Sequence, residues 1–187
     1  NMKKENTVLA VIDCQNDFIT GSLANTEAQK KVSNIVNKIN EFNGSSIFVT
    51  RDTHQKDYLS TKEGEKLPVE HCIEETWGWE LNDSIQDALN KAKIRGVNVV
   101  YVNKPTFGSE KLVEALRTDI KSSEFDIEIC GFCTDICVVS NALLIKAAFY
   151  DKVNITVNAS CTAGVTVDSH NAALTTMKMC QINVIDE

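Results

Sequence analysis

Hydrophobic residues along this chain alternate between short continuous runs and runs spaced three or four positions apart. The first continuous run, residues 7–13 (TVLAVID), is typical of a strand that is buried on both faces. Residues 27–42 then place Val32, Ile35 and Ile39 on one side of a helix. The opening of the chain therefore predicts a strand followed by an amphipathic helix.

The same alternation continues along the rest of the chain. The further strand-like runs are residues 46–51, 98–103, 125–130, 154–159 and 182–186. The further helix-like segments are residues 83–95, 109–121, 134–150 and 167–180. Strict alternation of strands and helices predicts a parallel sheet with helices on both faces. We therefore expect an α/β fold, a three-layer αβα sandwich of Rossmann-like type with a six-stranded parallel sheet.

Length and composition fit one globular domain covering residues 1–187, because 187 residues are too few for two ordinary domains. The net charge is −7 and no basic run occurs, which argues against a nucleic-acid partner. No apolar stretch approaches the length of a membrane span, so we expect no membrane partner. Asn1 precedes Met2 and is expected to be a remnant of expression, and we expect no secretory leader.

Seven cysteines are present, an odd number with irregular spacing. A secreted disulfide framework would need paired cysteines in a smaller chain. Cys130, Cys133 and Cys137 also lack the second Cys pair of a zinc ribbon. Reduced thiols in a cytoplasmic protein fit this pattern best.

Reactive side chains follow four of the predicted strands. Asp13 ends the first strand, Asp52 and His54 follow the second, Lys104 follows the third, and Cys137 comes shortly after the fourth. The carboxyl ends of parallel strands form the ligand-binding edge of such a sheet. A cysteine nucleophile needs a base and a cation, which Asp13 and Lys104 could supply. Taken singly, a terminal Asp is often a turn former and a terminal Lys a solvated charge.

Cys137 lies in the segment 131–138 (GFCTDICV), which reads as a tight turn opening the helix 134–150. A thiol in the first turn of a helix is close to free N–H groups and the positive end of the macrodipole. We therefore expect the pKa of Cys137 to be lowered. The alternative is that Cys137 is a small buried hydrophobic residue.

These residues resemble a known family. Asp13, the segment 15–18 (QNDF), Lys104-Pro105 and the segment 131–138 match the isochorismatase-like cysteine hydrolases in order and spacing. The resemblance covers nearly the whole chain and implies a catalytic triad of Asp13, Lys104 and Cys137. It also implies a cis peptide bond between Phe132 and Cys133.

In that family the backbone N–H groups at the positions of Cys133 and Cys137 form the oxyanion hole. Aromatic residues near the motifs are candidates to line the substrate pocket, although such positions are as often part of a core. These candidates are Phe18, Trp77, Phe107 and Phe132.

The long segment 52–82 has weak periodicity, and loops of this length are usually functional. Asp52, His54 and His71 in this segment resemble the metal ligands of the nicotinamidase branch. One carboxylate with two imidazoles suits zinc, iron or manganese, so the resemblance implies a divalent metal cofactor. Glu63 is a candidate fourth ligand, with Glu65 and solvent exposure as the alternatives.

The remaining histidine, His170, lies within the helix-like segment 167–180 and is expected to be structural.

The resemblance implies hydrolysis of a small aromatic amide such as nicotinamide to the acid and ammonia through a thioester. The enzyme would thus be a hydrolase of non-peptide C–N bonds in a homo-oligomer, a dimer or tetramer. One alternative is another hydrolase of the family, acting on a vinyl ether or on another amide or carbamoyl compound. A non-enzymatic binding module or thiol-redox protein is a third reading, although Cys133 and Cys137 are spaced CxxxC rather than CxxC.

Overall fold

The computed structural model describes residues 4–187, so Asn1 and its expected origin lie outside the described residues. The strands form one six-stranded sheet in the order β3-β2-β1-β4-β5-β6, and all neighbouring pairs are parallel. Their bounds are β1 Lys4–Ile12, β2 Gly44–Asp52, β3 Asn98–Lys104, β4 Phe125–Phe132, β5 Val153–Ala163 and β6 Asn183–Ile185. The predicted α/β sandwich is therefore confirmed.

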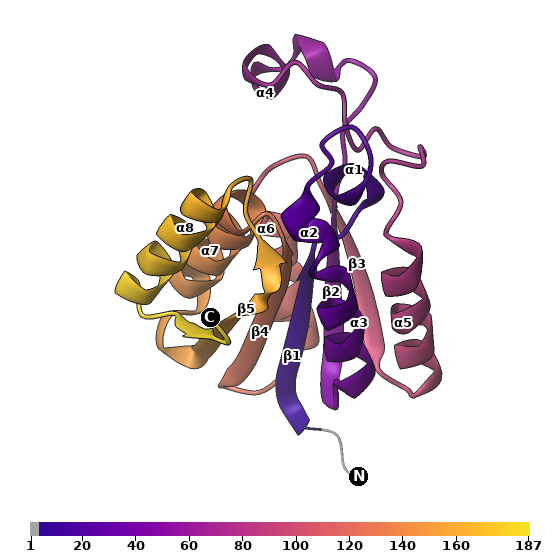
Figure 1. Ribbon diagram of the computed structural model, residues 1–187. Helices are drawn as coiled ribbons and strands as arrows, with labels where there is room; N and C mark the ends of the chain where they lie inside the picture. Colours follow the sequence, from indigo (N-terminus) through magenta and orange to yellow (C-terminus); the bar gives the residue numbers. More distant parts are fainter. Residues whose placement is uncertain (1–3) are drawn as a thin grey trace.

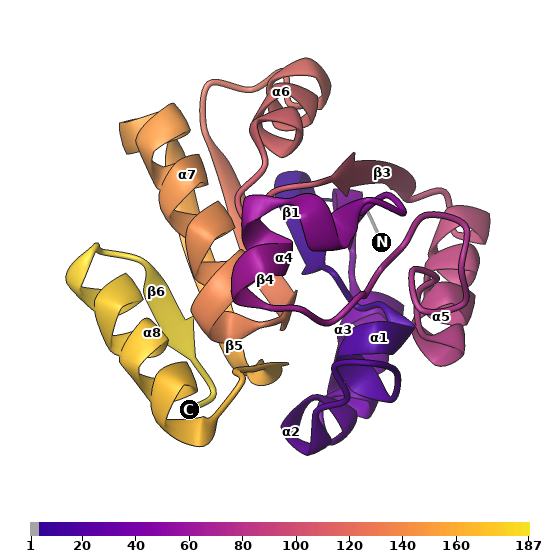
Figure 2. The same cartoon turned by 90° about the horizontal axis from the view of Figure 1, so that it is seen from above.

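Helices cover both faces of the sheet (Figure 1 and Figure 2). One face carries α1 Asn16–Ile19, α2 Thr26–Gln29, α3 Val32–Glu41 and α5 Asp83–Ile94. The other carries α6 Glu110–Asp119, α7 Val139–Phe149 and α8 Val167–Met179. Each face buries its own apolar cluster, with Ile35 and Leu89 fully buried on the first and Leu112 and Ile145 on the second. Among the described residues, no helix is long and apolar enough to span a bilayer.

The predicted helix 27–42 is wrong in one respect, because the chain turns at Lys30 and Lys31 and separates α2 from α3. Asn25 caps α2 by accepting a hydrogen bond from the Glu27 N–H at 2.9 Å. Gln29 at the other end donates to the Ile19 carbonyl at 2.8 Å. These contacts tie the short helix to the chain before it, so it does not continue into α3.

The segment that follows β2 stands above the carboxyl ends of the strands (Figure 1). It contains a short 3-10 turn, Tyr58–Ser60, and the helix α4 Lys62–Lys66. Residues just after β1 hold this segment in place. Asn16 Nδ2 donates to the Trp77 carbonyl at 2.8 Å, and an Asp17 carboxylate oxygen accepts from the Cys72 N–H at 2.8 Å.

The chain leaves β1 and β4 toward opposite faces of the sheet, although these two strands are neighbours. Such a reversal of strand order opens a crevice at the carboxyl ends, where ligands bind in α/β proteins. Asp13 follows β1 at this point, and Cys133 follows β4.

Candidate active site and metal centre

Asp13 is held rigidly at the end of β1. Its backbone has a φ of 49°, and its N–H donates to the Thr50 carbonyl at 3.1 Å. The Thr50 hydroxyl donates to one carboxylate oxygen at 2.7 Å, and the Lys104 ammonium lies 2.7 Å from the other. Burial raises the pKa of Asp13, and Lys104 and the Thr50 hydrogen bond lower it, with a net increase. Asp13 is therefore a buried carboxyl group that can accept a proton.

Lys104 at the end of β3 is completely buried. Its Nζ lies 2.7 Å from Asp13 Oδ2 and 3.3 Å from Cys137 Sγ, and it donates to the Thr106 carbonyl at 2.9 Å. The ammonium group thus donates to a carbonyl and to the sulfur, and it forms an ion pair with the Asp13 carboxylate. Burial lowers the pKa of Lys104, but Asp13 and Cys137 raise it above its ordinary value. The lysine is therefore a fixed positive charge between an acid and a thiol.

Cys137 lies in a π-helical turn, Thr134–Val138, that immediately precedes α7, and not in the first turn of an α-helix as predicted. Such turns are frequent at functional sites. Only 5% of the residue is exposed. Burial and the Asp13 carboxylate raise the pKa of the Cys137 thiol well above its ordinary value, although Lys104 opposes this increase. The expectation of a lowered pKa is therefore wrong, because desolvation outweighs the cation.

The Phe132–Cys133 peptide bond is cis, as the family resemblance implied. Cys133 is half-buried and lines the same cavity as Cys137. Burial raises the pKa of its thiol to about 12, so this second sulfur is protonated at neutral pH. Its neighbour Thr134 contacts His170 through the hydroxyl and Nδ1, 2.7 Å apart. His170 therefore supports the turn from α8, in line with the structural role expected for it.

Four side chains of the β2 end and the following segment converge on one point. Asp52 Oδ2 lies 3.0 Å from His54 Nε2 and 3.4 Å from His71 Nε2. Glu63 Oε2 lies 3.4 Å from His54 Nε2 and 3.5 Å from His71 Nε2. Zinc bonds of about 2.0–2.1 Å in a tetrahedron would place ligand atoms about 3.4 Å apart. Asp52, His54 and His71 therefore fit a divalent metal, and Glu63, which reaches both imidazoles, is favoured over Glu65 as a fourth ligand.

The surroundings of the cluster prepare it for a metal. His71 Nδ1 lies 2.8 Å from the Val69 carbonyl, so a hydrogen on Nδ1 leaves Nε2 free to bind a metal. Burial raises the pKa of Asp52, but hydrogen bonds from His54 and His71 lower it to about 2. Asp52 is therefore ionised at neutral pH, as a metal ligand must be.

Gln15 is a supporting residue whose role the sequence motif did not reveal. Its amide accepts from the Asp52 N–H at 2.7 Å and donates to the Asp52 carbonyl at 2.7 Å. It also donates to the Trp79 carbonyl at 2.9 Å. One buried side chain thus connects the end of β1 to the candidate metal ligand Asp52 and to Trp79 in the segment that follows β2.

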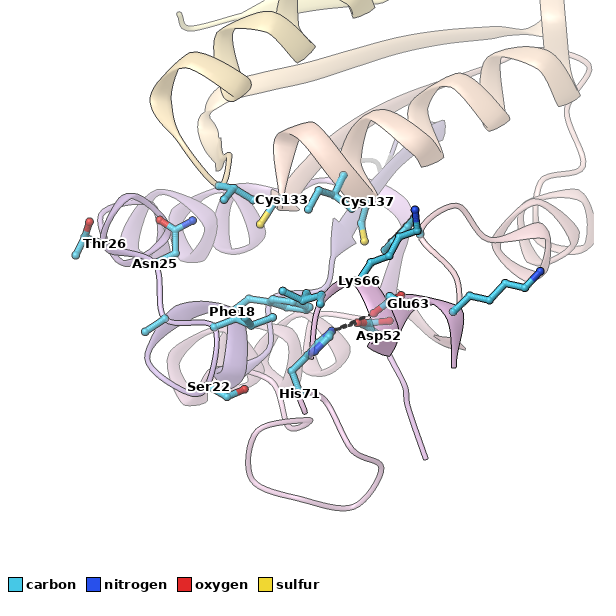
Figure 3. A pocket seen from close by; sticks show the side chains of 17 residues that line it. Phe18, Ser22, Asn25, Thr26, Asp52, Glu63, Lys66, His71, Cys133 and Cys137 are labelled. Carbon is cyan, nitrogen blue, oxygen red and sulfur yellow. Dashed lines mark ion pairs between the residues drawn. The ribbon is translucent and has the colours of Figure 1, made fainter. Parts of the chain in front are cut away.

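A cavity of about 950 Å³ extends from Cys137 to Asp52, Glu63 and His71 of the candidate metal site. Figure 3 shows Cys133 and Cys137 on one side of it and Phe18, His71 and Asp52 on the other. Its lining residues are Phe18, Ser22, Leu23, Ala24, Asn25, Thr26, Asp52, Lys62, Glu63, Lys66, Leu67, His71, Phe107, Cys133, Ile136, Cys137 and Val165. Apolar side chains and two cysteines make up about half of these residues, and polar or charged side chains make up the rest.

Two of the four aromatic candidates are placed as expected, since Phe18 and Phe107 line the cavity. Trp77 and Phe132 do not, and this corrects the prediction for both. Trp77 is 57% exposed at the surface of the segment after β2, while Phe132 is fully buried in the core at the end of β4.

Other wall residues were missed by the sequence analysis, among them Leu23, Leu67, Ile136 and Val165. Isolated apolar residues in otherwise polar loops were the only signal that could have indicated them.

Comparison with known proteins matches the isochorismatase domain to residues 7–187. The nicotinamidase of Schizosaccharomyces pombe is 26% identical over 209 residues, covering 96% of this chain and 92% of that protein. The crystal structure of nicotinamidase PncA from Bacillus subtilis superposes with a TM-score of 0.82 at 26% identity, covering 97% of this chain and 99% of that chain. A pyrazinamidase from Pyrococcus horikoshii, solved in complex with zinc, has a TM-score of 0.75 at 23% identity over 97% and 99% of the two chains.

Proposed function

The chain belongs to the isochorismatase family, and we propose that it is a nicotinamidase, a metal-containing cysteine hydrolase that converts nicotinamide to nicotinate and ammonia. The observation that carries this proposal is the position of Lys104 Nζ, 2.7 Å from Asp13 and 3.3 Å from Cys137. An acid, a cation and a thiol at these distances match the needs of nucleophilic catalysis by cysteine.

The reaction begins with a neutral thiol, because burial keeps the pKa of Cys137 high. Asp13 accepts the thiol proton as sulfur attacks the amide carbon, and Lys104 stabilises the developing thiolate. Asp13 then returns the proton to the leaving nitrogen, the C–N bond breaks and ammonia departs. Water adds to the remaining thioester and gives one proton to Asp13. The C–S bond then breaks, Asp13 returns that proton to the sulfur, and the acid is released.

We assign the oxyanion of both tetrahedral intermediates to the backbone N–H groups of Cys133 and Cys137. The position of both residues on the cavity wall supports this assignment. Each such donor contributes about 3 kcal/mol to transition-state stabilisation in other hydrolases.

Asp52, His54, His71 and Glu63 would hold the metal, for which zinc, iron and manganese are the candidates. A bound divalent metal would act as a Lewis acid that can coordinate the ring nitrogen of a pyridine amide and thereby orient the ring. Phe18, whose ring centroid lies 5.6 Å from that of His71, and Phe107 would bound the ring.

Another hydrolase of the family remains the alternative function, with a vinyl ether or a carbamoyl compound as substrate. Vinyl ether hydrolysis requires neither a thiol nor a metal. Cys137 lines one cavity together with Asp52, Glu63 and His71 of the candidate metal site, and this arrangement favours the amide.

We also propose that the chain is one domain of a cytoplasmic homo-oligomer, a dimer or tetramer. The seven cysteines, none of them in a disulfide within the described residues 4–187, support a reducing compartment. The mass of the purified protein in solution would measure the oligomeric state.

Ammonia release tests the proposed function. Purified protein loaded with zinc should release one ammonia per nicotinamide consumed, and Cys137→Ala protein should release none. Absence of ammonia release from nicotinamide and from related ring amides would refute the proposal. Turnover of a vinyl ether by the Cys137→Ala protein would instead support the alternative.

A further inference from the structure

Asn141 is a completely buried side chain on α7, one helical turn after Cys137. Its Nδ2 donates to the Cys137 carbonyl at 2.8 Å and to the Phe107 carbonyl at 3.0 Å. Its Oδ1 accepts from the Ser109 N–H at 2.9 Å. Both amide hydrogens and the amide oxygen are thus engaged, and two of the three bonds reach beyond α7, to the chain between β3 and α6.

These bonds connect two parts of the candidate active site that lie far apart in the sequence. One part is the π-helical turn that carries Cys137. The other is the loop 105–109 between β3 and α6, in which the Thr106 carbonyl accepts from Lys104 Nζ at 2.9 Å. The ring of Phe107 in the same loop lines the cavity. Asn141 therefore bonds directly to both the nucleophile turn and the cavity wall.

The loop also packs closely on α7. A Cβ placed on Gly108 would lie 3.4 Å from the Ser140 carbonyl oxygen. Ser109 ends the loop and caps α6 through its hydroxyl, which accepts from the Leu112 N–H at 3.1 Å. The loop is thus held at one end by β3 and at the other by this cap, and the Asn141 bond to the Phe107 carbonyl holds its middle.

We propose that Asn141 is a positioning residue, which holds the Lys104–Phe107 loop at a fixed separation from the Cys137 sulfur. The proposal rests on the proposed amidase function. It has two parts. The bond to the Cys137 carbonyl fixes the position of the nucleophile, and the bonds to Phe107 and Ser109 fix the position of the cavity wall that receives the substrate ring.

Two substitutions distinguish these parts. A threonine in a helix can donate its hydroxyl to the carbonyl four residues earlier, which for position 141 is that of Cys137. Asn141→Thr therefore keeps the nucleophile bond and loses both loop bonds. Asn141→Ala loses all of them.

We expect Asn141→Thr to raise the KM for nicotinamide about tenfold while kcat falls less than threefold. Asn141→Ala should raise KM similarly and also lower kcat at least tenfold. The difference in kcat between the two variants measures the bond to Cys137, so recovery of kcat by threonine is the decisive readout.

Asn158→Ala is the matched control for loss of stability. Asn158 on β5 is 2% exposed, and its amide binds Asp186 and Ser160, away from the cavity. This variant should lower the melting temperature about as much as Asn141→Ala and leave both kinetic constants within twofold. Circular dichroism would establish that each variant is folded.

Kinetic constants of folded Asn141→Ala within twofold of the parent would overturn the proposal. Identical kcat losses in the Thr and Ala variants would overturn its division into two parts.

A second measurement does not depend on the substrate. The rate at which iodoacetamide alkylates Cys137, followed by peptide mass spectrometry, should be at least fivefold lower in Asn141→Ala than in Asn158→Ala. An equal or faster rate in Asn141→Ala contradicts the positioning role even if nicotinamide is not the substrate. A failure of nicotinamide turnover together with the expected slower alkylation contradicts only the proposed function.

Discussion

The ammonium nitrogen of Lys104 lies 3.3 Å from the sulfur of Cys137, and both groups are buried. Burial favours the neutral thiol, so a thiolate forms only when the nearby cation compensates the new charge. The proton must leave at the same time for a nearby base, and the Asp13 carboxylate bound to the same ammonium is placed to accept it.

Replacing Cys137 by alanine should abolish ammonia release from nicotinamide while the protein stays folded. The change removes one buried sulfur, a small loss of packing, and the circular dichroism spectrum should not change. Cys180→Ala is the control, because Cys180 is exposed, and it should keep full activity. Measurable turnover by the Cys137 variant would contradict the role of the nucleophile.

Lys104→Met should destabilise the fold strongly, because it leaves the Asp13 carboxylate buried without its cation. Breaking one side of a buried ion pair costs about 3–5 kcal/mol of the free energy of unfolding. The double variant Asp13→Asn/Lys104→Met should recover part of this loss. Urea denaturation of the parent, the single variant and the double variant measures these free energies of unfolding. A loss below about 1 kcal/mol in the single variant would contradict a buried ion pair.

The acid limb of the pH profile should reflect Asp13. Burial raises its folded pKa, so Asp13 becomes protonated and stops acting as a base already above the ordinary carboxyl pKa of about 4. The ratio kcat/KM should therefore fall as the pH falls through this raised pKa.

The variant Thr50→Val tests whether this acid limb arises from the titration of Asp13. The Thr50 hydroxyl donates to Asp13 and lowers its pKa, so its removal should move the limb to higher pH. Values of kcat/KM measured across the pH range with saturating metal give the position of the acid limb in the parent and in Thr50→Val. An unmoved limb would assign the titration to a different group.

The two glutamates of α4 should differ in their effect on the metal. Glu63 reaches both imidazoles, whereas Glu65 is exposed. Glu63→Gln should lower zinc affinity at least tenfold, as loss of a metal-site contact typically does, and Glu65→Gln should not. Competition with a chelator measures the zinc affinity. Equal affinities of Glu63→Gln and Glu65→Gln would show that Glu63 does not bind the metal.

Treating the parent enzyme with excess chelator should stop ammonia release. Addition of zinc, manganese or iron should restore it, and the most effective ion would identify the preferred metal. Full activity of protein shown to be free of metal would contradict a role for the cluster in catalysis.

Gln15→Ala should weaken both the fold and the metal site. The variant leaves the Asp52 N–H and carbonyl without their partner, and each unsatisfied buried group costs about 1–3 kcal/mol. Thermal unfolding and zinc competition should both register the change. Gln86→Ala, a change at a half-buried position on α5 away from the cavity, is the control, and equal zinc affinities in the two variants would contradict a supporting role for Gln15.

The sequence predicted the strands from continuous apolar runs and the helices from apolar residues spaced three or four positions apart. Continuous apolar runs located every strand of the sheet, and the motif residues located Asp13, Lys104 and Cys137 near the carboxyl edge. The end of β5 had no such signal: residues 160–163 contain polar side chains, and they continue the strand because Thr162 and Ala163 pair with Gly131 and Phe132 of β4.

The sequence by itself determined the alternation of strands and helices, and with it the edge at which the reactive side chains collect, because periodicity and chain direction are local properties. Tertiary structure alone decided the charge state of the thiol, since desolvation depends on every neighbour that excludes water from Cys137. It also decided that Glu63 lies within 3.5 Å of both imidazoles, that Trp77 is exposed outside the cavity, and that Asn141 joins the Cys137 turn to the loop 105–109, because these depend on contacts between segments that no local pattern encodes.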